Sequence, residues 1–220
     1  MGSVLAQALP ISIGAALSVM PILVVILLLT GGRGAVNALL FTVGYAAALI
    51  GWGAVILAIG GGGSGGTEDS SVASAINLVL GLLFLVMALK KLSDHPDPDD
   101  PPPKWMEGLS SITAGKSFGF GFVFSALNIK NLAIYASALG VIALGGLTTA
   151  QTVIAWLLVI VVICSGLIIP VVAYAVMGDR ADALLNSMRE WLERNQRAIT
   201  IGVLLVFGTV FLAKGLVGLL

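Results

Sequence analysis

Long apolar stretches are the feature of this sequence that most limits how the chain can fold. A helix that crosses a bilayer needs about 20 consecutive, mostly apolar residues. Six stretches approach or exceed this length, at 5–30, 35–59, 72–89, 118–144, 153–177 and 199–219. Hydrophobic residues make up 58% of the chain and charged residues 10%, against about 25% charged in an average soluble domain. The sequence therefore excludes a soluble enzyme and predicts an all-α membrane protein with six transmembrane helices.

Charge and residue chemistry exclude several other classes of protein. Because 11 Lys and Arg residues balance 11 Asp and Glu residues, we expect no nucleic-acid partner. The single cysteine makes neither an internal disulfide nor a cysteine-based zinc site. Every Asp and Glu falls outside the predicted spans, which leaves no carboxylate in the membrane to bind a metal ion or relay protons. We also find no nucleotide-binding, hydrolase or metalloprotease motif, and we expect no enzymatic activity, catalytic residue, metal or cofactor.

The predicted spans fall into two groups of three, at 1–92 and 117–220. An acidic, proline-rich loop at 93–116 separates them. The second group includes a predicted amphipathic helix at 181–197, which we expect on the membrane surface, a position that also allows it to cap the bundle. Its apolar face consists of Leu184, Leu185, Met188, Trp191 and Leu192. The 28 glycines indicate helices that pack closely against one another.

Weak sequence matches relate the two groups of spans. Ala16-Leu-Ser-Val-Met-Pro21 and Ala126-Leu-Asn-Ile-Lys-Asn131 share an Ala-Leu start, a small polar residue and then a β-branched residue. The pattern Gly-x-x-Phe-Leu begins at Gly81 and again at Gly208. Because three is an odd number, a duplication of three spans gives halves of opposite orientation. The matches thus indicate a three-plus-three inverted repeat, which is a transporter architecture with its site where broken helices meet.

Positive residues predict the orientation of the chain in the membrane. Nine of the 11 Lys and Arg residues lie after the first, third and fifth predicted spans, and none lies in the other two loops. Positive residues accumulate on the cytoplasmic side. We therefore expect a multi-pass protein of the cytoplasmic membrane, with the loop at 93–116 and the helix at 181–197 inside and both termini outside.

Lys130 is the candidate substrate-binding residue, because it lies near the middle of the fourth predicted span. A central lysine costs at least about 2.5–3.5 kcal/mol on insertion scales and marks a functional site by default. With no carboxylate in the membrane to pair with it, Lys130 favours an anionic ligand, to which Asn128, Asn131 and Ser18 offer hydrogen bonds. A structural lysine bonded to backbone carbonyls is the alternative. Pro21 is the candidate hinge, since proline breaks a helix.

Lys214, the other lysine within a predicted span, lies near the end of the sixth span. We expect its side chain to extend to the outer interface.

Three segments of the chain have distinctive sequences, Trp105-Met-Glu-Gly-Leu-Ser110, Gly115-Lys-Ser-Phe-Gly-Phe-Gly121 and Ala126-Leu-Asn-Ile-Lys-Asn-Leu132. Together with the first span from Ser18 to Thr30, they resemble a known family, the lipid-addressing proteins of actinobacteria. These are the glycopeptidolipid- and sulfolipid-addressing proteins, a branch of the lysine exporter superfamily. Ile129 stands where the family usually has proline, while Asn128, Lys130, Asn131 and Leu132 match.

The resemblance implies export of a lipid or glycolipid, and the residues favour an anionic one. We therefore predict a transporter that moves an anionic amphiphile across the membrane, with membrane lipid or glycolipid as its partner. Two alternatives stay open, a small-solute exporter of amino-acid type and an accessory scaffold of a lipid-export complex. The glycine-rich faces also fit a homodimer.

Overall fold

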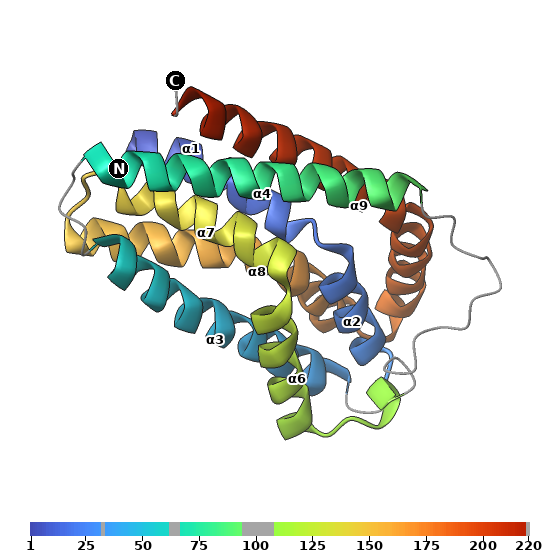
Figure 1. Cartoon of the computed structure of the whole chain (residues 1–220). Coiled ribbons are helices and arrows are strands. Elements are labelled where there is room, and N and C mark those ends of the chain that lie inside the picture. Colours follow the sequence, from blue (N-terminus) through green and yellow to red (C-terminus); the bar gives the residue numbers. More distant parts are fainter. Residues whose placement is uncertain (32–33, 62–66, 94–107, 219–220) are drawn as a thin grey trace.

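The protein is all-helical over the residues that its structure, a computed structural model, describes. These residues are 1–31, 34–61, 67–93 and 108–218, and no strand occurs among them. Most of the predicted loop at 93–116 lies outside them. The helices in chain order are α1 Gly2–Ala16, α2 Val19–Leu29, α3 Gly34–Gly61, α4 Thr67–Ser93, the 3₁₀ turn η1 Gly108–Ser111, α6 Ala114–Leu127, α7 Ile129–Ala143, α8 Thr149–Met177, the 3₁₀ turn η2 Gly178–Arg180 and α9 Ala181–Val217 (Figure 1).

Three to five candidate membrane spans occur in the described residues. Helices α3, α8 and α9 are each long and apolar enough to cross a membrane, and the pairs α1–α2 and α6–α7 meet the same test as bent units. These spans cover five of the six predicted stretches. The stretch at 72–89 forms part of α4, which is not among the candidate spans although it has 27 residues. The helices fit a multi-pass membrane protein.

Local sequence explains where α8 begins and ends. The Thr148 hydroxyl accepts a hydrogen bond from the Gln151 N–H, and the Gln151 side chain accepts one from the Thr148 N–H, at 3.4 and 3.1 Å. This reciprocal cap satisfies two donors that the first helical turn leaves free. Gly178 ends the helix with a φ of 55°, which glycine adopts without steric cost.

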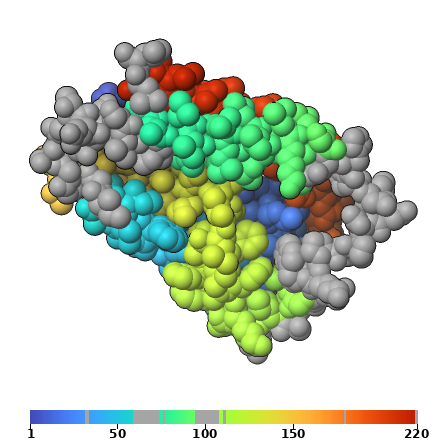
Figure 2. Space-filling model, viewed as in Figure 1, coloured from blue at the N-terminus to red at the C-terminus, as the bar shows by residue number. Residues whose placement is uncertain are grey.

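Glycines let helices from the two halves of the chain lie close together. Helix α3 packs along α6, where a Cβ at Gly44 would meet the backbone of Phe118 and one at Gly121 would meet the backbone of Phe41. Helix α4 packs along α9 in the same way, through Gly81, Gly208 and Gly215. Figure 2 shows the green α4 lying along the red end of α9. The predicted role of glycine in close packing is confirmed at these two contacts.

The predicted helix at 181–197 is not a separate element, because α9 runs without interruption from Ala181 to Val217. No glycine or proline lies between 181 and 201 to end a helix there. The first, orange part of α9 nevertheless runs in a different direction from the red part, which lies along α4 (Figure 1). Of its predicted apolar face, Leu185 and Leu192 are buried, whereas Trp191 is 56% exposed.

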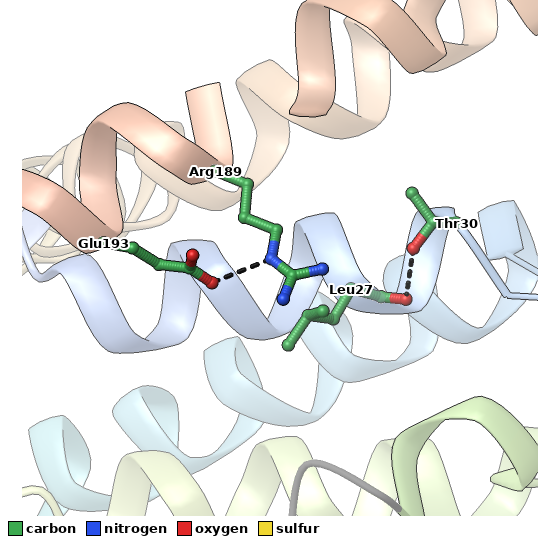
Figure 3. A network of polar contacts seen from close by, with 4 residues as sticks. All are labelled: Leu27, Thr30, Arg189 and Glu193. Atoms are coloured by element: carbon green, nitrogen blue, oxygen red, sulfur yellow. Dashed lines mark hydrogen bonds and ion pairs between the residues drawn. The ribbon is translucent and has the colours of Figure 1, made fainter. Parts of the chain in front are cut away.

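The first part of α9 lies against the end of α2. Arg189 donates a hydrogen bond from Nε to Glu193 at 2.8 Å, and Figure 3 shows its guanidinium extending toward the end of α2. There the Thr30 hydroxyl donates to the Leu27 carbonyl at 3.0 Å (Figure 3). A cation near the C-terminal end of a helix is favoured by the helix dipole.

Candidate functional site

The first helix break lies between α1 and α2, which meet at 56°. Helix α1 gives way to α2 at Leu17 and Ser18, and Pro21 lies in the first turn of α2. Proline has no N–H to donate to the carbonyl four residues earlier, and its ring clashes with that carbonyl. For Pro21 that carbonyl belongs to Leu17, which accounts for the position of the break. The candidate hinge Pro21 is thus buried beside the break.

The second break lies at Asn128, where α6 and α7 meet at 70°. No proline is present here, because Ile129 follows Asn128. Instead, the Asn128 side chain caps α7 by accepting a hydrogen bond from the Asn131 N–H at 3.3 Å. The Asn128 N–H donates to the Ser125 carbonyl, also at 3.3 Å. Asparagine is among the best residues for this capping position, so its side chain stabilises the break that proline provides elsewhere.

The two breaks meet at the carbonyl of Ala15. This oxygen accepts a hydrogen bond from the Ser18 N–H at 3.2 Å and one from Asn131 Nδ2 at 3.4 Å. Ser18 and Asn131 are both buried, with 4% and 3% of their surface exposed. The structure thus brings together Ser18, Asn128 and Asn131, three of the four predicted substrate-binding residues.

Asn131 also belongs to a ladder of polar contacts between α3 and α7. Its Nδ2 donates to the Tyr45 hydroxyl at 3.0 Å. One helical turn further along both helices, the Tyr135 hydroxyl donates to the Leu49 carbonyl at 2.8 Å. Trp156 Nε1 on α8 donates to the same Tyr135 hydroxyl at 2.7 Å. The ladder therefore joins three helices in the middle of the bundle.

Sequence analysis missed Tyr45, Tyr135 and Trp156. One signal was present in the sequence, because Asn131 and Tyr135 lie four residues apart and so share a helix face. Gly53 completes the ladder, since a Cβ there would clash with Trp156 Nε1 and the Tyr135 hydroxyl.

Two oxygens at the second break are buried, and one of them, Asn131 Oδ1, has no hydrogen-bond partner among the described residues. The other is Ser125 Oγ. A buried polar atom without a partner costs about 1–3 kcal/mol. Ser125 Oγ lies within reach of the Tyr45 hydroxyl, so Asn131 Oδ1 is the acceptor that stays uncommitted in this cluster.

Lys130 is the second residue of α7 and is partly buried. Its ammonium group makes no hydrogen bond or ion pair within the described part of the chain. Successive helical residues point about 100° apart, so Lys130 does not share the face on which Asn131 meets α1 and α3. No hydrogen bond joins the Lys130 side chain to Ser18 or Asn131 in the described residues. The fourth predicted site residue is thus next to the cluster in sequence but outside its hydrogen-bond network.

An apolar cavity of about 490 Å³ lies beside the first break. Ala16, Leu17 and Ile22 form the wall next to the break, Gly166 and Ile169 contribute from α8, and Trp191 contributes from the first part of α9. Serine side chains supply its few polar groups, at Ser165 and Ser187. The cavity has the size and lining of a site for a hydrocarbon chain.

The helices around the two breaks carry positive charge but no carboxylate. Within the described residues, no group of three or more His, Cys, Asp and Glu residues is able to hold a metal ion. Helices α1, α2, α3, α6, α7 and α8 contain no Asp or Glu. Lys130 is the one charged residue of α7, the helix that follows the second break.

Comparison with known proteins identifies the family of the chain. Neither the curated proteins nor the solved structures give a match. Residues 8–217 match the family described as Sap, sulfolipid-1-addressing protein. Because the match covers nearly the whole chain, the protein belongs to the sulfolipid-1-addressing protein family.

Proposed function

We propose that the protein is a transporter that moves an anionic amphiphile, a lipid or glycolipid, outward across the cytoplasmic membrane. Membership of a sulfolipid-addressing family suggests a role in lipid handling. The observation that carries the proposal is the unpaired ammonium of Lys130 at the start of α7.

The charge of Lys130 favours an anionic ligand. Burial of an ammonium group without a counterion is costly, and the helices around the breaks offer no carboxylate. The first turn of α7 adds its free N–H groups and the positive end of the helix dipole. A sulfate, phosphate or carboxylate head group next to Lys130 would pair with the ammonium group and accept hydrogen bonds from these N–H groups.

The uncommitted polar atoms around the breaks fit the rest of a head group. The Asn128 amide nitrogen and the Ser18 hydroxyl make no hydrogen bond within the described residues and offer donors. Asn131 Oδ1 offers only an acceptor, which suits a hydroxyl of a sugar better than an anionic oxygen. This set favours a glycolipid.

The cavity beside the first break suits the acyl part of the ligand. Its wall is almost entirely apolar, and its rim residues Leu17 and Ile169 are 52% and 58% exposed. An exposed apolar rim within the candidate spans gives an acyl chain a route from the bilayer.

An inverted repeat of three spans supports a transport mechanism. In our assignment the bent pair α1–α2 corresponds to α6–α7, α3 to α8, and α4 to the second part of α9. Helix α4 is then a membrane span as well, which brings the number of spans to six. Apolar residues exposed on its surface, such as Val79 and Leu89 at 61% each, suit contact with lipid. Rocking of one half against the other at the two breaks would expose the site to each side in turn.

Two basic segments of the chain meet at one end of the bundle, which we assign to the cytoplasm. Arg197 of α9 donates to the carbonyls of Lys91 and Leu92 at 3.2 and 2.8 Å. This contact joins two of the three basic segments of the chain. The positive-inside rule then places that end inside and the N-terminus and the end of α9 outside.

Mass spectrometry of lipids that copurify with the protein tests the proposal. We expect a specific anionic lipid on the unmodified protein, its loss from Lys130→Ala, and its retention on Lys130→Arg, which keeps the charge. Equal lipid profiles for all three proteins, with only bulk membrane lipid bound, would remove Lys130 as the head-group site.

A further inference from the structure

A second cavity, of about 410 Å³, lies between α4, α7 and α9. Three polar side chains line it, one from each helix: Asn77, Ser137 and Lys214. The remaining wall is apolar and includes Leu80, Val141 and Leu144. This arrangement is unlike the first cavity, because a positive charge and two hydrogen-bonding groups converge on one space.

Lys214 is an exposed residue of α9 and lines this cavity, and the extension of its side chain to the outer interface stays a prediction. No described residue forms an ion pair or hydrogen bond with its ammonium group. None of the residues that line the cavity carries a carboxylate. The ammonium group therefore lacks a protein counterion, and the Asn77 amide and the Ser137 hydroxyl are able to donate to the same anion.

Helix α7 connects this cavity with the second break. Lys130 and Ser137 lie seven residues apart on α7, which is nearly two full turns, so they share one face at a separation of about 10 Å along the axis. Lys130 does not itself line the cavity, but Ser137, which does, lies on the same face of α7. The end of α9, which carries Lys214, lies toward the same end of the bundle as the N-terminus (Figure 1).

We infer that the cavity between α4, α7 and α9 is a second binding site for the anionic head group of an amphiphile. Lys214 supplies the charge, and Asn77 and Ser137 supply hydrogen bonds. The head group shares its chemistry with free phosphate or sulfate, but the apolar wall of Leu80, Val141 and Leu144 gives an attached hydrocarbon a surface that a free anion does not use. The inference rests on the proposed function, in which the head group first binds at Lys130.

Lysine labelling tests the second site in the full-length protein. The protein is placed in nanodiscs of phosphatidylcholine, with or without the anionic lipid phosphatidylglycerol, and treated with a small membrane-permeant amine reagent. Peptide mass spectrometry then gives the labelling rate of each lysine. We expect phosphatidylglycerol to slow the labelling of Lys214 relative to Lys116, an exposed lysine in the first turn of α6.

A double variant separates binding in the cavity from contact with bulk lipid. Asn77→Ala with Ser137→Ala leaves Lys214 in place but removes both partners, so protection of Lys214 should be lost. Unchanged elution on size-exclusion chromatography confirms that the variant is folded. Protection that persists in this variant, or equal Lys214 labelling with and without phosphatidylglycerol, would overturn the inference.

Two further comparisons show whether a negative result contradicts the second site alone or the proposed function as well. Inorganic phosphate added to phosphatidylcholine nanodiscs should protect Lys214 less than phosphatidylglycerol does, and equal protection would overturn the assignment to an amphiphile. Lys130 is measured in the same samples. Protection of Lys130 alone would support the proposed function and overturn the second site, whereas protection of neither lysine would contradict both.

Discussion

The rings of Phe84 and Phe211 pack with their centroids 5.6 Å apart, in a contact where α4 and α9 present matching sequences to each other. A Cβ at Gly81 would meet the backbone of Leu212, and one at Gly208 would meet Leu85. The two copies of Gly-x-x-Phe-Leu therefore pack reciprocally. A two-fold relation between the halves of the chain predicts this pattern of contacts, which is why we propose an inverted repeat.

Alanine at Gly81 should weaken this contact. The added Cβ would meet the backbone of Leu212, which has less freedom to move than a side chain. We expect the free energy of unfolding to fall by about 1–3 kcal/mol, as is usual for overpacking. Thermal unfolding in detergent measures the change.

Gly202→Ala on α9 is the matched control, because nothing lies within 4 Å of a Cβ at that position. It should be neutral or stabilising, since alanine is better than glycine in a helix by up to about 1 kcal/mol. Equal stability of the two variants would contradict close packing at Gly81.

Replacement of Asn128 separates its capping role from its proposed role in ligand binding. Asn128→Ala should lower the free energy of unfolding by about 1 kcal/mol, because the Asn131 N–H loses its acceptor. Asn128→Ser should restore most of that stability, since serine also caps helices, but it lacks the amide donors offered to the head group. Lipid retention and thermal stability are measured on the same preparations. A serine variant as unstable as the alanine variant would argue against capping.

The sequence analysis located most of the helices, because hydrocarbon thickness sets a length that apolar stretches reveal directly. It also marked the positions of both breaks, where Pro21 and Asn128 interrupt apolar runs. It was wrong to separate the helix at 181–197 from the span that follows. No helix-ending residue lies between them, and the change from an amphipathic to an apolar pattern alters the surroundings of α9 without ending it.

Only those residues of the site that stand out from their neighbours in the sequence could be predicted. Ser18, Asn128 and Asn131 stand out as polar residues in apolar runs, and the structure brings them together. Tyr45 and Trp156 meet α7 through the crossing of α3 and α8, and they lie 86 and 21 residues from their partners. Helical periodicity carries no information on such crossings, so these contacts could not be predicted from it.

Removal of the Tyr135 hydroxyl should destabilise the middle of the bundle. Tyr135→Phe leaves Trp156 Nε1 without its acceptor, at a cost of about 1–3 kcal/mol for a buried polar group left unpaired. The Leu49 carbonyl loses the bond from Tyr135 but, within α3, keeps its helical hydrogen bond. Thermal unfolding of Tyr135→Phe, Trp156→Phe and the double variant forms a double-mutant cycle. We expect the double variant to lose less stability than the two single losses added together, because both variants remove the same hydrogen bond. Strict additivity would show that this bond contributes nothing.

Filling the cavity beside the first break should displace a bound acyl chain. Ser165 lines this cavity from α8, so Ser165→Phe places a ring in the space that we assign to hydrocarbon. The amount of copurifying lipid should fall while its head-group preference, set at Lys130, stays the same. Val161→Phe adds a ring on the same helix at a position that is 58% exposed and does not line the cavity, and it should leave lipid binding unchanged. If both variants retain lipid equally, the acyl chain lies elsewhere, whereas a changed head-group preference in Ser165→Phe would mean that the cavity and Lys130 do not act as separate parts of one site.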